Sequence, residues 1–475
     1  MRLILGFAVP TLFGLLFQQM YSRVDTMIVG KLLGARALAA VGATGSISFL
    51  IIGFCMGVCS GFAIPVARQM GAGEHSLMRR YVANGAYLSG AFALVMTAAT
   101  CLACRRILSA MDTPADIFAD SYRYIFIIFA GIPATYLYNL LAGVIRSLGD
   151  SRTPVYFLAL SSLLNIVLDV ALILWGGMGV AGAALATVIS QAVSGLACLW
   201  TVHRRFPILH IGRRERGLDG KLCRDLCAMG VPMGLQYSVT AVGSIVLQSA
   251  VNGLGSLYVA ATAAGAKLYG FLACPFDAMG AAMATYCGQN VGAGKLDRLG
   301  KGIRDCSALG FVYSLMAFGA MALFAPACAM WFIDSGEGEQ LPLLVSLVSQ
   351  YVRIGTGFFF PLALVNIVRF SIQGMGYSVL AILAGVLEMV ARAVVGFWFV
   401  PAAGYTAACC ASPAAWICAD LFLIPACALC IRRLRRNKDG YRRYERAMAW
   451  EKGGVLRLLR RRAPSGDDGP HKRIA

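Results

Sequence analysis

Two carboxylates within apolar stretches are the residues best placed to do chemistry. Asp25 lies in "MYSRVDTMIVGKLLG", which continues an almost wholly apolar run from Leu3, and Asp169 ends "NIVLD". Asn165 precedes Asp169 by four residues, so the two share one face of a helix. Thr187 lies in the next apolar segment. Carboxylate, amide and hydroxyl oxygens suit a hard cation, and the carboxyl groups can hold a proton instead. These side chains therefore predict a cation or proton site.

A purely structural role for these acids is the alternative. Asp25 would then pair with Arg23 or Lys31 at a membrane edge, and Asp169 would complete a polar network. Arg23 is two residues from Asp25, so these side chains do not face each other on a helix. An ionisable residue within an apolar span is rare and marks a functional site by default. We therefore favour the functional interpretation.

The composition indicates a membrane protein. The chain has 475 residues, of which 59% are hydrophobic and 14% charged, and its mean hydropathy is +0.70. A soluble protein of ordinary composition has about 25% charged residues. Long apolar runs recur, each near the roughly 20 residues that cross a hydrocarbon core. They are too long and too uniformly apolar for barrel strands, so we expect helices. The first run lacks a cleavage site, so we expect no cleaved signal peptide.

We predict an all-α membrane protein with twelve transmembrane helices. The predicted spans are 3–30, 38–66, 81–103, 121–144, 154–175, 178–201, 227–252, 257–288, 302–332, 343–370, 378–402 and 404–431.

The basic residues set the expected orientation. They gather in the even-numbered connections, most densely in 204–224, and the formal net charge is +19. Because positive loops stay in the cytoplasm, we expect both termini to be cytoplasmic. The basic tail 432–475 fits contact with anionic lipid headgroups, and we expect no nucleic-acid partner.

Motifs for an enzyme or a zinc site are absent from the sequence. The sixteen cysteines lie mostly inside predicted helices, and the CxxC pairs at 101–104 and 427–430 have no nearby histidine. We interpret them as small packing residues. The glycines of 177–182 have the GxGxxG spacing, but no acid follows about 20 residues on to bind a ribose. No nucleophile stands with a base, so we expect neither an enzyme nor an organic cofactor.

The chain repeats itself at a spacing of just over 220 residues. "GAG" occurs at 71–73 and 292–294, and "NLLAGVIRSLGDS" from Asn139 resembles "NIVRFSIQGMGYS" from Asn366. Six spans per half return the chain to the same side, so the repeats are parallel. We predict a V-shaped, two-lobed secondary transporter. Its expected parts are an N-terminal lobe 1–203, a cytoplasmic linker 204–224, a C-terminal lobe 225–431 and the tail 432–475.

From about Val9 to Cys430 the sequence resembles the multidrug and toxic compound extrusion (MATE) transporters. The strongest similarity lies in "QQMYSRVDTMIVGKLLG", "QMGAGE", "NIVLD", "GMGVAGAALATVISQ" and "GQNVGAGK". The resemblance implies export of organic cations or other lipophilic compounds, driven by inward flow of Na+ or H+. It implies a small-molecule substrate and a multi-pass location in the bacterial cytoplasmic membrane, and we expect a monomer.

The resemblance also implies the residues of the ion-coupling site, whereas the cleft candidates are our own interpretation of the sequence. Those matching the ion-coupling site, with possible Na+ ligation, are Asp25, Asn165, Asp169 and Thr187, together with Ala183, which offers only a backbone carbonyl. Candidates for a substrate cleft are Gln19, Tyr21, Tyr136, Tyr138, Met283 and Glu388, although aromatic and Met residues at helical spacing more often pack.

The second half departs from the family pattern, because its first span (227–252) contains no acid. It has instead Lys267, Asp277, Glu388 and Arg392. Glu388 and Arg392 are four residues apart, so we predict a mutual ion pair. The alternative is that Glu388 or Asp277 faces the cleft and attracts a cationic substrate.

Two other functions compete with multidrug export. A flippase for lipid-linked sugars needs a basic cleft to hold a pyrophosphate, and the first-half spans contain almost no interior basic residues. A membrane receptor or scaffold needs sizeable external domains, and the predicted external loops are short.

Overall fold

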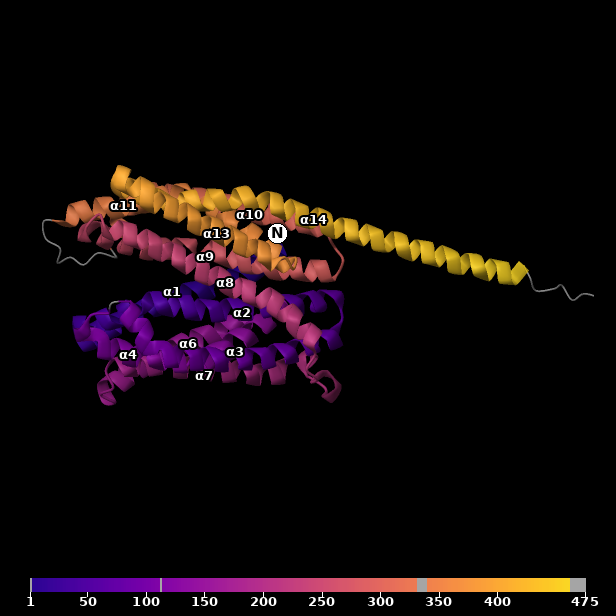
Figure 1. Cartoon of the computed structure of the whole chain (residues 1–475), viewed down its shortest axis with the longest axis horizontal. Coiled ribbons are helices and arrows are strands. Elements are labelled where there is room, and N and C mark those ends of the chain that lie inside the picture. Colours follow the sequence, from indigo (N-terminus) through magenta and orange to yellow (C-terminus); the bar gives the residue numbers. More distant parts are fainter. Residues whose placement is uncertain (1, 112, 331–339, 462–475) are drawn as a thin grey trace, which may run out of the picture.

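The computed structural model describes residues 2–111, 113–330 and 340–461. These residues form helices and no strands. Figure 1 shows two layers of helices, with α1 to α7 in one and α9 to α14 in the other, and with α8 passing between them. The first layer contains α1 (Arg2–Ala43), α2 (Gly45–Ala72), α3 (His75–Ala110), α4 (Ala115–Ala130), α5 (Ile132–Ser147), α6 (Arg152–Val170), the π-helical turn η1 (Ala171–Trp175) and α7 (Val180–Arg205).

Two short 3-10 turns, η2 (Pro207–Leu209) and η3 (Arg213–Glu215), connect α7 to the second half. That half contains α8 (Gly220–Asn252), α9 (Ser256–Gly292), α10 (Asp297–Met330), α11 (Leu341–Gly357), α12 (Phe359–Gly374), α13 (Ser378–Val394), the π-helical turn η5 (Val395–Phe399) and α14 (Val400–Arg461).

The described helices agree with twelve spans once their breaks are counted. Nine segments are long and apolar enough to cross a membrane, or eleven when two bent pairs each count as one span. The segment Ser378–Asn437 counts once among these although Gly404, at φ +62°, divides it in two. The bent pairs are α4–α5, at 44°, and α11–α12, at 52°. Pro133 and Pro361 stand just after these bends and lack the N–H that a continuous helix requires.

Glycines with positive φ mark the two repeats. Only glycine adopts this backbone region readily, so the breaks between helices depend on it. The glycines recur in four pairs: Gly34 and Gly255, Gly73 and Gly294, Gly149 and Gly376, Gly179 and Gly404. The members of each pair are 221 to 227 residues apart, which matches the sequence repeat. The same chain path is therefore used twice, as predicted.

The two layers meet through backbones that approach closely. Gly57 and Gly61 of α2 lie against Gly230 and Gly234 of α8, and a Cβ atom on Gly57 would stand 2.5 Å from the Met233 carbonyl oxygen. Glycine at every fourth position lets two membrane helices approach at their backbones. Because the hydrophobic effect does not drive helices together within lipid, van der Waals contact between the backbones stabilises the pair.

The layers also meet where α2 and α9 end, next to the basic connections. We call this the basic end of the molecule. A Cβ atom on Gly71 would clash with the backbone of Gln289, and one on Gly292 with the backbone of Arg68. The Gln289 side chain donates a hydrogen bond of 2.9 Å to the Ser147 carbonyl oxygen. The two layers are therefore in contact at the basic end.

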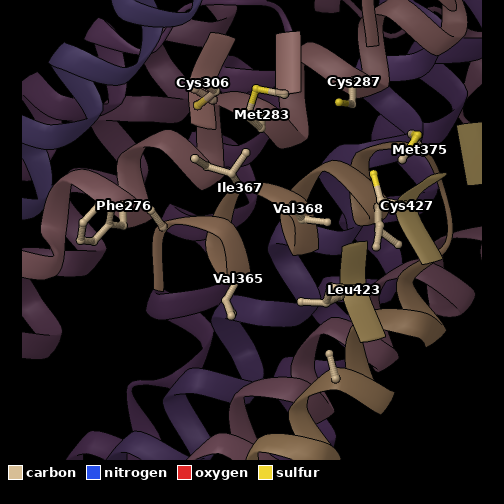
Figure 2. Packing of buried hydrophobic residues seen from close by; sticks show 14 of the residues in the cluster. Phe276, Met283, Cys287, Cys306, Val365, Ile367, Val368, Met375, Leu423 and Cys427 are labelled. Atoms are coloured by element: carbon tan, nitrogen blue, oxygen red, sulfur yellow. The ribbon is translucent and has the colours of Figure 1, made fainter. Parts of the chain in front are cut away.

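The core of the second layer is apolar and includes cysteines. Figure 2 shows Phe276, Met283, Ile367, Cys287 and Cys427, which belong to one cluster of buried residues. Among the described residues all sixteen cysteines are free. The ten that are buried act as small apolar side chains.

Hydrogen bonds and an ion pair join the connection between α7 and α8 to α3. Arg79 donates two hydrogen bonds of 2.7 Å to Glu215, and Ser76 donates a third of 2.8 Å. Arg80 bonds Asp219 at 2.8 Å. The bond from Arg79 lowers the pKa of Glu215 from 4.5 to about 2. The carboxylate therefore contributes its stability above pH 4.5 and loses it as the pH falls towards 2.

The first prediction concerns the glycine contact. Gly61→Ala should lower the free energy of unfolding by about 1–3 kcal/mol, because the new methyl group meets the backbone of α8. Gly90→Ala in α3 is the control, since its Cβ would have no neighbour within 4 Å. Melting temperatures in detergent would measure the effect. Equal melting temperatures for the two variants would show that the close approach of α2 and α8 does not contribute to stability.

The second prediction concerns the connection between α7 and α8. Glu215→Gln should speed tryptic cleavage at Arg213, Arg214 and Arg216, because the charge-assisted bonds to α3 are weakened at neutral pH. The exposed Glu74→Gln should leave the cleavage rate unchanged. Gel analysis over time measures both rates, and cleavage of E215Q at the native rate would contradict the role of Glu215.

Candidate functional site

Three helices of the first layer bring the predicted acids together. The carboxyl groups of Asp25, from α1, and Asp169, from α6, are in hydrogen-bonding contact. Asp169 is fully buried and Asp25 is half-buried. A hydrogen bond between two carboxyl groups requires a proton on one of them. The Oδ1 atom of each acid is buried and has no hydrogen-bond partner among the described residues.

Asn165 joins the acids to α7. With its amide nitrogen turned to Asp169 it donates to Oδ2 at 3.0 Å, and its oxygen accepts from the Thr187 backbone N–H at 3.0 Å. The Thr187 hydroxyl lies 3.2 Å from Asn165 and 3.2 Å from the Ala183 carbonyl oxygen. The structure thus gathers all five residues predicted for ion coupling at one site.

The local fold after Asp169 explains how α6 and α7 meet. The helix widens into η1 two residues later, and π-helical turns of this kind are frequent at functional sites. Gly177 and Gly179 then reverse the chain with positive φ. A Cβ atom on Gly182 would lie 3.2 Å from the Leu172 backbone, so α7 packs directly on the widened turn.

Two tyrosines surround the acid pair. Tyr21 of α1 lies within hydrogen-bonding reach of Thr187 and close to both acids. Tyr124 of α4 lies close to Tyr21 and to both acids. Sequence analysis missed Tyr124, because no motif or spacing relates α4 to the acid-bearing helices.

A cavity with a mixed polar and apolar lining adjoins the site. Its volume is about 260 Å³, it is partly open, and residues of α2, α4, α5 and α7 line it. The polar side chains that line it are Ser48, Tyr124, Thr135, Thr187 and Gln191. Thr135 donates a 2.7 Å hydrogen bond to Gln191. Since liquid water occupies about 30 Å³ per molecule, several waters fit beside Thr187.

The six candidates for a substrate cleft are spread over the molecule. Gln19 is exposed on α1, beside Gly270 of α9, and Tyr21 belongs to the acid site. The Tyr138 hydroxyl donates to the Pro154 carbonyl oxygen at 3.1 Å.

The other three candidates are buried within the helix layers. Tyr136 is 2% exposed, Met283 is fully buried in the apolar core of Figure 2, and Glu388 is 3% exposed. Their proposed contact with a substrate remains a prediction.

Glu388 is the centre of a buried ion cluster in the second layer. The predicted pair with Arg392 forms, at 3.4 Å, and Arg369 of α12 binds the other carboxylate oxygen. Asp420 of α14 lies near Arg369. Sequence analysis missed the part played by Arg369, although an arginine inside the predicted span 343–370 was a visible signal. Lys267 and Asp277 do not join this ion cluster and are exposed on α9.

Comparison with known proteins finds one family. The MatE family model matches residues 10–171 and 232–398. The probable multidrug resistance protein YpnP of Bacillus subtilis (strain 168) is 30% identical over 295 residues, which cover 62% of this chain and 65% of YpnP. The probable multidrug resistance protein NorM of Thermotoga maritima is 22% identical over 376 residues, covering 78% of this chain and 79% of NorM. The chain spans slightly less than two thirds of YpnP and of YoeA, a further Bacillus subtilis relative.

Solved structures share the fold. One, described as the outward-facing conformation of a multidrug resistance MATE family transporter, has a TM-score of 0.85 at 21% identity and covers 91% of this chain and 96% of its own. A MATE protein in a bent conformation has a TM-score of 0.84 at 21% identity, covering 92% of this chain and 96% of its own.

Proposed function

The chain belongs to the MatE family of membrane transporters, and we propose that it is an antiporter that exports organic cations or other lipophilic compounds. Inward flow of Na+ or H+ drives the export. The observation that carries this proposal is the contact between Asp25 and Asp169. The relatives named as multidrug resistance proteins support the substrate class.

The acid pair suits reversible binding of one cation. Two carboxylates in contact repel each other strongly where little water screens them. A proton shared between them, or a sodium ion bound by both, removes that repulsion. Asn165 and Thr187 supply further oxygen atoms within the same site, which suits a sodium ion.

Helix α1 provides the coupling. Its Asp25 faces the first layer, whereas Arg23 stacks on Phe271 of α9 at 4.6 Å from the ring centre. Ile4 and Ala8 of the same helix pack in the core of the second layer. Helix α1 therefore contacts both layers. A cation that changes the contact of Asp25 with Asp169 can alter how the two layers are arranged through this helix.

The proposed cycle rocks two lobes, 1–203 and 225–431, about the contact at the basic end. The linker 204–224 moves with the first lobe, since Glu215 and Asp219 bind α3. We propose that the basic end and both termini are cytoplasmic and that the membrane is the bacterial cytoplasmic membrane. The contact at the basic end then corresponds to an outward-facing state.

Lipid-linked sugar transport is the weaker candidate. A pyrophosphate group needs unpaired positive charge in the substrate path. The buried arginines of the second layer, Arg369 and Arg392, instead bind Glu388.

The third prediction tests the acid pair. Asp25→Asn and Asp169→Asn should each abolish gradient-driven uptake of ethidium into inverted vesicles, because neither leaves a carboxyl pair to bind the coupling ion. Asp297→Asn is the control, as that side chain is 99% exposed on α10. Undiminished uptake by both site variants, at native protein levels, would remove the acid pair from the mechanism.

The fourth prediction separates the two ions. Thr187→Val removes a hydroxyl ligand at nearly constant volume. If sodium drives export, uptake under a sodium gradient should fall by about tenfold or more, the loss expected for one hydrogen bond to a charged group. If protons drive export, uptake under a proton gradient should stay near the native rate, since the carboxyl pair remains. Transport that follows neither gradient in the native protein would refute ion-driven antiport of ethidium.

A further inference from the structure

Asp277 is an acid at the middle of α9 with an unusual exposure. Its neighbours Phe276 and Ala278 are buried, at 0% and 1%, whereas Asp277 itself is exposed. The helix is long and apolar enough to span the membrane. A carboxylate at that depth is costly in contact with lipid, so it must face protein or water.

The face of α9 that carries Asp277 is turned to the first repeat. A Cβ atom on Gly270 would lie 3.7 Å from the Gln19 amide of α1, and one on Gly288 would lie 3.3 Å from Ala67 of α2. Gly270, Asp277 and Gly288 are 7 and 11 residues apart, spacings that return to one side of a helix. Asp277 therefore lies in the seam between the two layers. It is eleven residues closer to the start of α9 than Gly288, which lies near the basic end.

The other helices at this seam also present polar side chains. Gln19 of α1 lies at the seam, with its amide nitrogen 3.7 Å from the position of a Cβ atom on Gly270. Tyr237 of α8 lies close to Asp277. Its Cβ atom lies 3.4 Å from the position that a Cβ atom on Gly53 of α2 would occupy. The seam therefore contains an amide and a phenol close to the helix that carries Asp277.

Aromatic rings and charge complete the arrangement. Phe271 lies six residues before Asp277, about 9 Å along the helix at 1.5 Å per residue. The guanidinium of Arg23 covers its ring at 4.6 Å. Arg369 is near Asp277, but its guanidinium binds Glu388. The seam thus offers a carboxylate and an aromatic face to a cation.

We propose that Asp277 anchors the positive charge of an exported organic cation and that Phe271 supplies the aromatic platform, which the Arg23 guanidinium covers when no substrate is bound. This assignment rests on the proposed export function. A planar cation displaces Arg23 from Phe271 because both compete for one ring face. Since Arg23 and Asp25 belong to the same helix, the displacement also acts on the acid pair.

The test measures binding of ethidium, a planar cation, to the purified full chain in detergent by fluorescence titration. Asp277→Asn should raise the Kd by roughly tenfold or more, the loss of a charge-assisted contact. Asp277→Glu should retain most of the affinity, and Asp297→Asn should match the native protein. Arg23→Gln should lower the Kd, because the Arg23 guanidinium then no longer competes for the face of the Phe271 ring.

The outcomes separate this assignment from the export function. An unchanged Kd in Asp277→Asn, or no ethidium binding by the native protein, would overturn the assignment even if other dyes are exported. Weakened binding in Asp277→Asn together with no gradient-driven efflux by the native protein would refute export and leave the binding site standing. If Asp277→Asn does not fold, Phe271→Leu replaces it, and native affinity in that variant would overturn the assignment. An unchanged Kd in Arg23→Gln would remove Arg23 as the competing cation.

Discussion

A charge within a membrane must be neutralised, shared or hydrated, and this constraint organises the chemistry of the chain. The described residues contain all three solutions. Asp25 and Asp169 are in contact, so one cation or proton serves both. Glu388 pairs with two arginines inside the second layer, and Asp420 lies near one of them. Asp277 lies in a polar seam. Each solution places a different demand on the helices around it.

The two repeats share a backbone and differ in their charges. Both have a π-helical turn after the span that carries the buried charges, η1 after Asp169 and η5 after Arg392. In the first repeat that span presents a carboxylate beside an amide. In the second it presents a carboxylate already bound by arginine. A symmetric scaffold can therefore change ion affinity in one lobe and preserve a permanent ion cluster in the other.

Glycine contacts between the layers allow a change at one ion site to alter how the two layers are arranged. Gly57 and Gly61 let α2 approach α8 at the backbone, and the rings of Phe54 and Phe62 lie against Gly234 and Gly230. Such a contact is close but contains few specific bonds. A small change in the pairing of Asp25, transmitted through α1, can then shift the balance between two arrangements of the same layers.

The sequence by itself determined the membrane class, the helices, the parallel repeats and the presence of the acid pair, because hydropathy, repeats and rare charges are local or periodic signals. It also predicted the Glu388–Arg392 pair, which one helical turn dictates. Only the tertiary structure decided the bends at Gly131 and Phe358, the approach of Tyr124 to the acids and the third ion partner Arg369. It also decided that Met283 and Tyr136 are buried while Asp277 is exposed. These features depend on which faces of distant helices meet, and packing between helices, rather than spacing along one, sets that choice.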